Sequence, residues 1–123
     1  MAEVAALVDD LMFLSRIREA ARGHGLDVKA VRTAADALAA AHAGARVVIV
    51  DLDSPRVASA DALAALRADP GASSLPIVGF FSHVEPQRGQ DGLRAGCTTV
   101  LPRSAFVLQL DALLADAARP PAP

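Results

Sequence analysis

The chain has 123 residues, a formal net charge of −2 at neutral pH and 53% apolar residues. This length suits one compact domain with a core of its own, and the acidic balance argues against nucleic acid as the main ligand. No apolar run is long enough to span a bilayer, the N-terminus lacks the basic segment of a signal peptide, and one cysteine excludes an intramolecular disulfide. We therefore expect a cytoplasmic protein without a membrane partner.

Five short apolar runs predict β-strands. They are Val4–Val8, Leu26–Val31, Val47–Val50, Ile77–Phe81 and Thr98–Leu101. The runs that start at Val47 and Ile77 are almost continuously apolar, which is typical of central strands buried on both faces. The second run alternates apolar and polar residues, so we expect it at an edge of the sheet.

Helical spacing appears between these runs. The first stripe consists of Leu14, Ile17, Ala21 and His24, and the last one of Phe106, Leu110, Leu113 and Ala117. A second helix is predicted after Thr33, a candidate N-cap, and a third one contains Leu63 and Leu66.

The fourth helix, from Pro86 to Ala95, has the weakest signal. Gly89 and Gly92 lie inside it, and each glycine costs about 1 kcal/mol relative to alanine in a helix interior. We therefore expect local mobility in this helix. The last helix begins after Ser104 if that residue is its N-cap.

Strands and helices that alternate through short connections predict a single α/β domain over residues 1–118. Its architecture is a doubly wound (βα)5 sandwich around a five-stranded parallel sheet. Residues 119–123 are expected to form a disordered tail or the start of a linker. Ligands of such sheets bind beyond the carboxyl ends of the strands.

Acidic residues follow two of the predicted strands. Asp9 and Asp10 come after the first, and Asp51 and Asp53 come after the third. Adjacent strands lie about 5 Å apart, so these carboxylates should converge. Their mutual repulsion calls for a cation, protonation or a basic side chain, and an all-oxygen set suits Mg²⁺. For any single one of them, N-capping of the following helix is the simpler interpretation.

The segments "ALVDDLMFLSRI" and "VVIVDLDSP" resemble the response-regulator receiver domain of two-component signalling, and "LPIV" and "LRAGCTTVL" extend the resemblance from Val4 to Ala118. It implies a flavodoxin-like receiver topology. It also implies that Asp51 accepts a phosphoryl group from a histidine kinase, and that Pro55 shapes the following loop. Asp10 would bind Mg²⁺ directly, Asp9 through water, and Asp53 through its backbone carbonyl.

The remaining positions of the resemblance are altered. Phe81 stands where the family has a hydroxyl that bonds the phosphoryl group, with Ser82 next to it, and Val100 stands at the position of the inward-turning aromatic residue. Arg103 replaces the lysine that faces the phosphoryl group, which keeps the charge but places it differently. This is the pattern of an atypical receiver, or pseudo-receiver.

The sequence thus favours a receiver-like signalling module without enzymatic activity, which acts by binding a histidine kinase or another signalling protein. The resemblance implies the face of the fourth helix, fifth strand and fifth helix as the contact surface, and the same face would serve a weak homodimer. A conventional Mg²⁺-dependent phospho-acceptor is the first alternative. A small Mg²⁺-dependent phosphatase with an aspartate nucleophile and a purely structural domain are more distant ones.

Overall fold

The structure is a computed structural model that describes residues 2–54, 59–82 and 87–119. The strands are β1 (Val4–Leu7), β2 (Val28–Ala30), β3 (Val47–Asp51), β4 (Ile77–Phe81) and β5 (Thr99–Pro102). The helices are α1 (Leu11–Arg22), α2 (Ala34–His42), α3 (Ser59–Ala68), α4 (Gln87–Ala95) and α5 (Arg103–Ala118).

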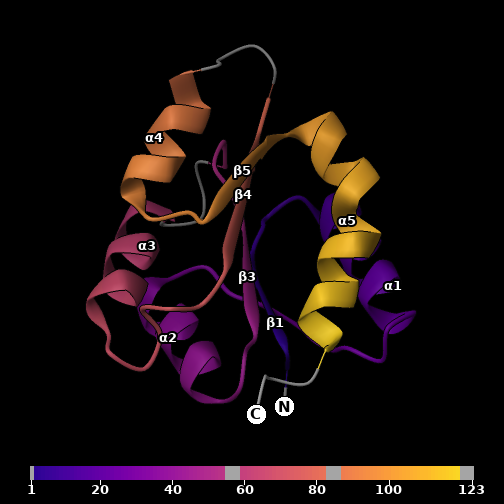
Figure 1. Cartoon of the computed structure of the whole chain (residues 1–123), viewed down its shortest axis with the longest axis horizontal. Coiled ribbons are helices and arrows are strands. Elements are labelled where there is room, and N and C mark those ends of the chain that lie inside the picture. The colour runs from indigo at the N-terminus through magenta and orange to yellow at the C-terminus, as the bar shows by residue number, and fades with distance from the viewer. Residues whose placement is uncertain (1, 55–58, 83–86, 120–123) are drawn as a thin grey trace.

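All neighbouring strands pair in parallel, in the order β2-β1-β3-β4-β5. Helices α1 and α5 cover one face of the sheet, and α2, α3 and α4 cover the other (Figure 1). The predicted five-stranded doubly wound fold is therefore confirmed. None of the helices in the described part of the chain has the length and apolar character that crossing a membrane requires.

The burial of the strands follows their place in the sheet. Every residue of β3 and β4 is buried, as predicted for central strands, and every residue of β1 is buried as well. Strand β2 is at an edge, also as predicted, but it has only three residues, with Lys29 exposed. The flanking Leu26 and Val31 are buried although they lie outside the strand, so their apolar character extended the prediction beyond it. Strand β5 forms the other edge and ends at Pro102.

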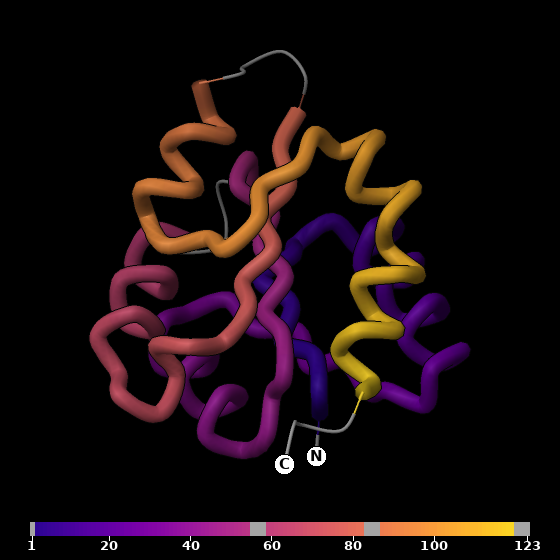
Figure 2. Tube along the Cα trace, in the orientation of Figure 1, coloured from indigo at the N-terminus to yellow at the C-terminus, as the bar shows by residue number. Residues whose placement is uncertain are grey.

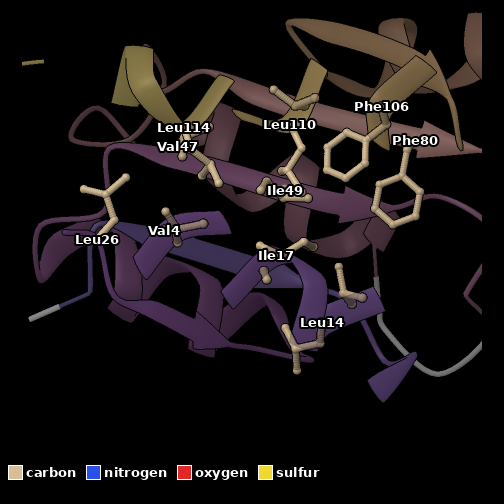
Figure 3. Close-up of a cluster of buried hydrophobic side chains, with 14 residues drawn as sticks. Val4, Leu14, Ile17, Leu26, Val47, Ile49, Phe80, Phe106, Leu110 and Leu114 are labelled. Atoms are coloured by element: carbon tan, nitrogen blue, oxygen red, sulfur yellow. The ribbon is translucent and has the colours of Figure 1, made fainter. Parts of the chain in front are cut away.

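Alternation along the strands divides the core between the two faces. Val4 and Ala6 of β1 belong to the cluster under α1 and α5, whereas Ala5 and Leu7 belong to the cluster under α2 and α3. Figure 3 shows the first cluster, in which side chains of α1 and α5 meet those of the central strands.

Three phenylalanine rings form the end of this first cluster next to the carboxyl edge of the sheet. The ring centroid of Phe80 in β4 lies 4.6 Å from that of Phe13 in α1 and 4.7 Å from that of Phe106 in α5, and the latter two lie 5.7 Å apart. Phe80 and Phe106 are fully buried. The stack therefore joins both helices of this face to the centre of the sheet.

The ends of the helices partly match the predictions. Thr33 caps α2, because its side chain accepts a hydrogen bond from the N–H of Asp36. Helix α5 begins at Arg103, so Ser104 lies within its first turn and the prediction that it is the N-cap is wrong. Pro86, the predicted start of the fourth helix, lies outside the described residues.

The two glycines of α4 allow the helix to approach the sheet closely. A Cβ atom on Gly92 would lie 2.7 Å from Cδ1 of Leu52 and 3.1 Å from Cγ2 of Val100. A Cβ atom on Gly89 would lie 3.1 Å from the ring of Phe81. These glycines weaken the helix signal in the sequence, but here they are contact positions. The helix then turns directly into β5 (Figure 2) through Gly96, whose φ is +126°.

Arg67, at the end of α3, connects three segments. Its Nε donates to the carbonyl of Gly96 at 2.7 Å, and one terminal nitrogen donates to the carbonyls of Ser73 and Leu75 at 2.7 and 3.0 Å. The other terminal nitrogen donates to Oγ1 of Thr98 at 3.2 Å. One side chain thus fastens the α3–β4 connection and the α4–β5 turn to α3.

Cys97, in the segment between α4 and β5, is buried. Burial raises the pKa of its thiol to about 11, so the side chain stays a neutral thiol at physiological pH.

Candidate functional site: an acid hollow at the carboxyl edge of the sheet

The four predicted aspartates lie at one edge of the sheet, as the strand order requires. Asp9 and Asp10 follow β1, Asp51 is the last residue of the neighbouring β3, and Asp53 comes two residues later. They line an open hollow of about 570 Å³ together with Arg103, the first residue of α5. We call it the acid hollow. Pro55, predicted to shape the adjacent loop, lies outside the described residues.

Asp51 is the buried acid of this group, with 4% of its surface exposed. Its Oδ1 accepts a hydrogen bond from the backbone N–H of Asp53 at 3.0 Å, and its Oδ2 lies 3.7 Å from a terminal nitrogen of Arg103. Burial raises the pKa of the Asp51 carboxyl, although the hydrogen bond and the Arg103 guanidinium act in the opposite direction.

Replacing Asp51 with asparagine is expected to raise the free energy of unfolding at neutral pH by on the order of 1 kcal/mol, because a buried charge is removed while the acceptor oxygen stays. The raised pKa means that the folded state binds the proton more tightly than the unfolded state. The charge therefore lowers stability above the folded-state pKa, and this loss disappears as the pH falls through that value.

Urea unfolding at a series of pH values checks this expectation. The difference between wild type and Asp51→Asn should shrink as the solution becomes acidic, whereas Asp36→Asn, at an exposed position of α2, should show no such gain. A variant that is less stable than wild type at neutral pH would contradict the assigned cost of the buried charge.

Asp10 has two roles. Its Oδ1 accepts hydrogen bonds from the N–H groups of Met12 and Phe13 at 3.0 and 3.1 Å, so it is the N-cap of α1. Its Oδ2 points to the hollow and lies 3.8 Å from Arg103. Asp9 pairs instead with Arg32 at 2.8 Å. The capping interpretation thus holds for Asp10. Its second carboxylate oxygen faces Arg103, the same residue that faces Asp51.

Arg103 lies between the two carboxylates. One terminal nitrogen faces Asp10 and the other faces Asp51, while its carbon Cζ lies 4.9 Å from the ring centroid of Phe13 and 5.4 Å from that of Phe80. The aromatic stack therefore supports the guanidinium from below by cation–π attraction. Arg103 is the residue that the resemblance assigns as the phosphate-facing cation, and its guanidinium lies at the acid hollow.

The chemistry of this hollow suits a hard divalent cation. Within residues 2–54, 59–82 and 87–119, no three or more histidine, cysteine or acidic side chains are grouped closely enough to hold a metal ion. Yet Oδ2 of Asp10 and Oδ2 of Asp51 face one and the same positive group. Carboxylate oxygens are the kind of ligand that Mg²⁺ takes, and in this structure Arg103 supplies the positive charge that they face.

Asp53 does more than the sequence indicated, since only its backbone carbonyl was assigned a role. Its Oδ2 accepts the backbone N–H of Ser82, at the end of β4, at 2.6 Å. Its Oδ1 lies 3.2 Å from Nε of Arg88 in α4. Together with its own N–H, which donates to Asp51, this side chain connects β3, β4 and α4.

The altered positions contact α4. Phe81 is 8% exposed and its ring lies against Gly89, and Val100 reaches the same helix at Gly89 and Gly92. Phe80 packs on the opposite face of the sheet, as alternation requires. Hence Phe81, which stands where the family has a hydroxyl, packs as an apolar side chain against α4. Ser82 contacts the site through its backbone N–H, which donates to Asp53.

Arg88 is the residue that sequence reasoning missed. It occurs in "QRGQDGLRA", a polar segment in which nothing distinguishes one arginine from the other. Its place at the acid hollow depends on where α4 packs, which the local pattern does not encode.

The order of the five parallel strands and the site at their carboxyl edge define a flavodoxin-like receiver fold. No protein-family model matches the sequence, and no curated relative matches it. Solved structures do. A response regulator from Hahella chejuensis is 19% identical with a TM-score of 0.79, and the match covers 95% of either chain.

Two further structures make the same point. The receiver domain of a sensor histidine kinase from Pseudomonas aeruginosa, described with a magnesium ion coordinated in its active-site cleft, is 19% identical with a TM-score of 0.76, over 95% of this chain and 97% of that one. A chemotaxis response regulator of Vibrio cholerae is 23% identical with a TM-score of 0.75, over 95% and 98%. At such identities the likeness shows the fold.

Proposed function

We propose that this chain is a receiver-like signalling module of a two-component or phosphorelay system, which works by binding a histidine kinase or another signalling protein. The observation that carries the proposal is the placement of Asp51. It is the buried last residue of β3, it opens onto the acid hollow, and Arg103 lies opposite it.

The proposal also concerns the residues that would respond to a group on Asp51. Phe81 and Val100 pack on the glycines of α4, and their side chains have no polar atom that could bond to a group on Asp51. We therefore infer a pseudo-receiver, in which the acid hollow is kept and the usual hydroxyl and aromatic relay is lost.

Exposed apolar side chains support the protein-binding role. Leu93 of α4 is 52% exposed and Leu108 of α5 is 85% exposed. Both belong to the two helices that flank β5, the surface that the resemblance implies. We propose this surface for partner binding and for a weak homodimer.

Mg²⁺ is the proposed cofactor. Asp10 and Asp51 would hold it directly, with Asp9 acting through water and Asp53 through its carbonyl. When bound, it would neutralise charge on the oxygens of a phosphoryl group. The chain's own contribution is to keep Asp51 in place through the Asp53 N–H and to hold Arg103 opposite it.

A conventional phospho-acceptor is the second candidate, and the open hollow with an arginine opposite Asp51 favours it. In that reaction an Asp51 carboxylate oxygen forms a bond to phosphorus while the bond from phosphorus to the kinase's histidine nitrogen breaks. The imidazole leaves as the neutral group because the other nitrogen of the phosphorylated ring already carries a proton, so the step needs no further acid.

Incubation with acetyl phosphate and Mg²⁺, followed by intact-mass measurement, separates these candidates. We expect no stable adduct on the wild type. An adduct that is absent in Asp51→Asn and present in Asp36→Asn would replace the pseudo-receiver with the conventional receiver. Turnover of an aryl phosphate that Asp51→Asn abolishes would instead indicate the phosphatase.

A further inference from the structure

Helix α4 is fastened to the acid hollow through Arg88. Its Nε lies 3.2 Å from Oδ1 of Asp53, and one terminal nitrogen donates to the carbonyl of Leu52 at 3.4 Å. The side chains of Arg88 and Asp53 are 39% and 26% exposed. This pair is therefore only partly screened by solvent, and it joins α4 to the segment that directly follows Asp51.

Asp53 in turn is fastened to the centre of the hollow. Its N–H holds Oδ1 of Asp51, and its Oδ2 receives the N–H of Ser82 from the end of β4. A displacement of Asp53 therefore changes the support of Asp51, and a change of charge at Asp51 acts on the neighbouring Asp53 carboxylate.

Helix α4 also packs closely against neighbouring side chains through its two glycines. Gly89 follows Arg88 directly and lies against the Phe81 ring, and Gly92 lies against Leu52 and Val100. A movement of the α4 backbone at Arg88 therefore also displaces Gly89 against the Phe81 ring, since close-packed groups transmit small displacements.

Two arginines thus face the carboxylates from two helices: Arg103 of α5 faces Asp10 and Asp51, and Arg88 of α4 faces Asp53. A group that adds or removes charge in the hollow changes the attraction that each guanidinium experiences. Of the two helices, α4 is the one that also packs on the altered positions Phe81 and Val100.

We propose that Arg88 is a positioning residue through which the charge of the acid hollow sets the position of α4, in place of the lost hydroxyl and aromatic relay. The inference rests on the proposed function in one respect: it takes the acid hollow as the end of the molecule that receives the signal. The responding surface is α4, where Leu93 is exposed.

Amide hydrogen exchange in a double-mutant cycle tests the proposal on the full chain. The variants are Arg88→Gln, Asp53→Asn and the two combined, and exchange over residues 87–95 is compared with exchange over α3. We expect each single change to raise exchange in α4 about two- to five-fold, the equilibrium effect of one partly exposed ion pair. The combined variant should exchange no faster than either single one.

Two matched variants separate charge coupling from simple loss of packing. Arg94→Gln removes the exposed arginine of the last turn of the same helix and should leave exchange in α4 unchanged. Arg88→Lys keeps the charge and should retain most of the wild-type protection. Additive effects of Arg88→Gln and Asp53→Asn, or equal effects of Arg88→Gln and Arg94→Gln, would overturn the proposal.

Addition of Mg²⁺ alone, the proposed cofactor, distinguishes a failure here from a failure of the proposed metal site, and we expect Gly89 and Gly92 amide shifts that depend on Arg88. If the Asp53 amide shifts in the NMR spectrum but the Gly89 and Gly92 amides respond equally with and without Arg88, the role of Arg88 is refuted while the acid hollow remains a receiving site. If the Asp53 amide does not respond to Mg²⁺ but the exchange cycle shows coupling, the role of Arg88 stands and the proposed Mg²⁺ site is refuted.

Discussion

Replacing Phe80 with alanine is expected to lower the free energy of unfolding by about 3–5 kcal/mol, the range for truncating a large buried aromatic side chain. Phe80 is fully buried and contacts both Phe13 and Phe106, so the cavity would open between α1, α5 and the sheet. The guanidinium of Arg103 would also lose one of the two rings beneath it. Urea unfolding followed by circular dichroism measures the loss.

Phe80→Leu is the matched control, because it keeps most of the volume and the apolar contact. We expect it to cost less than about 1.5 kcal/mol. Equal losses for the alanine and leucine variants would mean that the ring stack, and not the filled volume, stabilises this face of the sheet.

Replacing Arg67 with alanine is expected to lower the free energy of unfolding by about 2–4 kcal/mol, because three backbone carbonyls and a threonine hydroxyl lose a charged donor. Two of these carbonyl partners, Ser73 and Leu75, precede β4, and the third, Gly96, precedes β5. The loss should therefore appear first as faster amide exchange in these two connections.

Arg22 provides the comparison, since it is an exposed arginine in the last turn of α1, as Arg67 is in the last turn of α3. Arg22→Ala should change stability by less than about 0.5 kcal/mol. If the two variants were equally stable, the network around Arg67 would contribute nothing beyond a surface arginine.

Most of the fold could be predicted because its signals are local. Continuous apolar runs identified β3 and β4 as central strands, and alternation identified β2 as an edge strand. The prediction for β2 was too long because Leu26 and Val31 are core residues outside the ladder. Likewise, the position of Asp10 before a helix indicated a cap as readily as a site residue, and it proves to be a cap with one oxygen in the hollow.

The remainder depends on tertiary packing. Gly89 and Gly92 indicated a weak helix when taken as propensities, but their contacts with Phe81 and Leu52 bring α4 close to the sheet. That close approach is what brings Arg88 to Asp53. Arg67 likewise has no sequence signature, because its partners lie on connections whose meeting point is set by the completed fold.

The two edges of the sheet limit how this chain can meet a partner. Strand β2 is three residues long with exposed Lys29, and β5 ends on Pro102, which has no N–H to donate. Short, charged or proline-containing edges resist the addition of a further strand. Recognition by strand pairing, and fibrillar self-association along the sheet, are therefore disfavoured at both edges, so a partner on the face of α4, β5 and α5 would contact side chains and not the strand backbone.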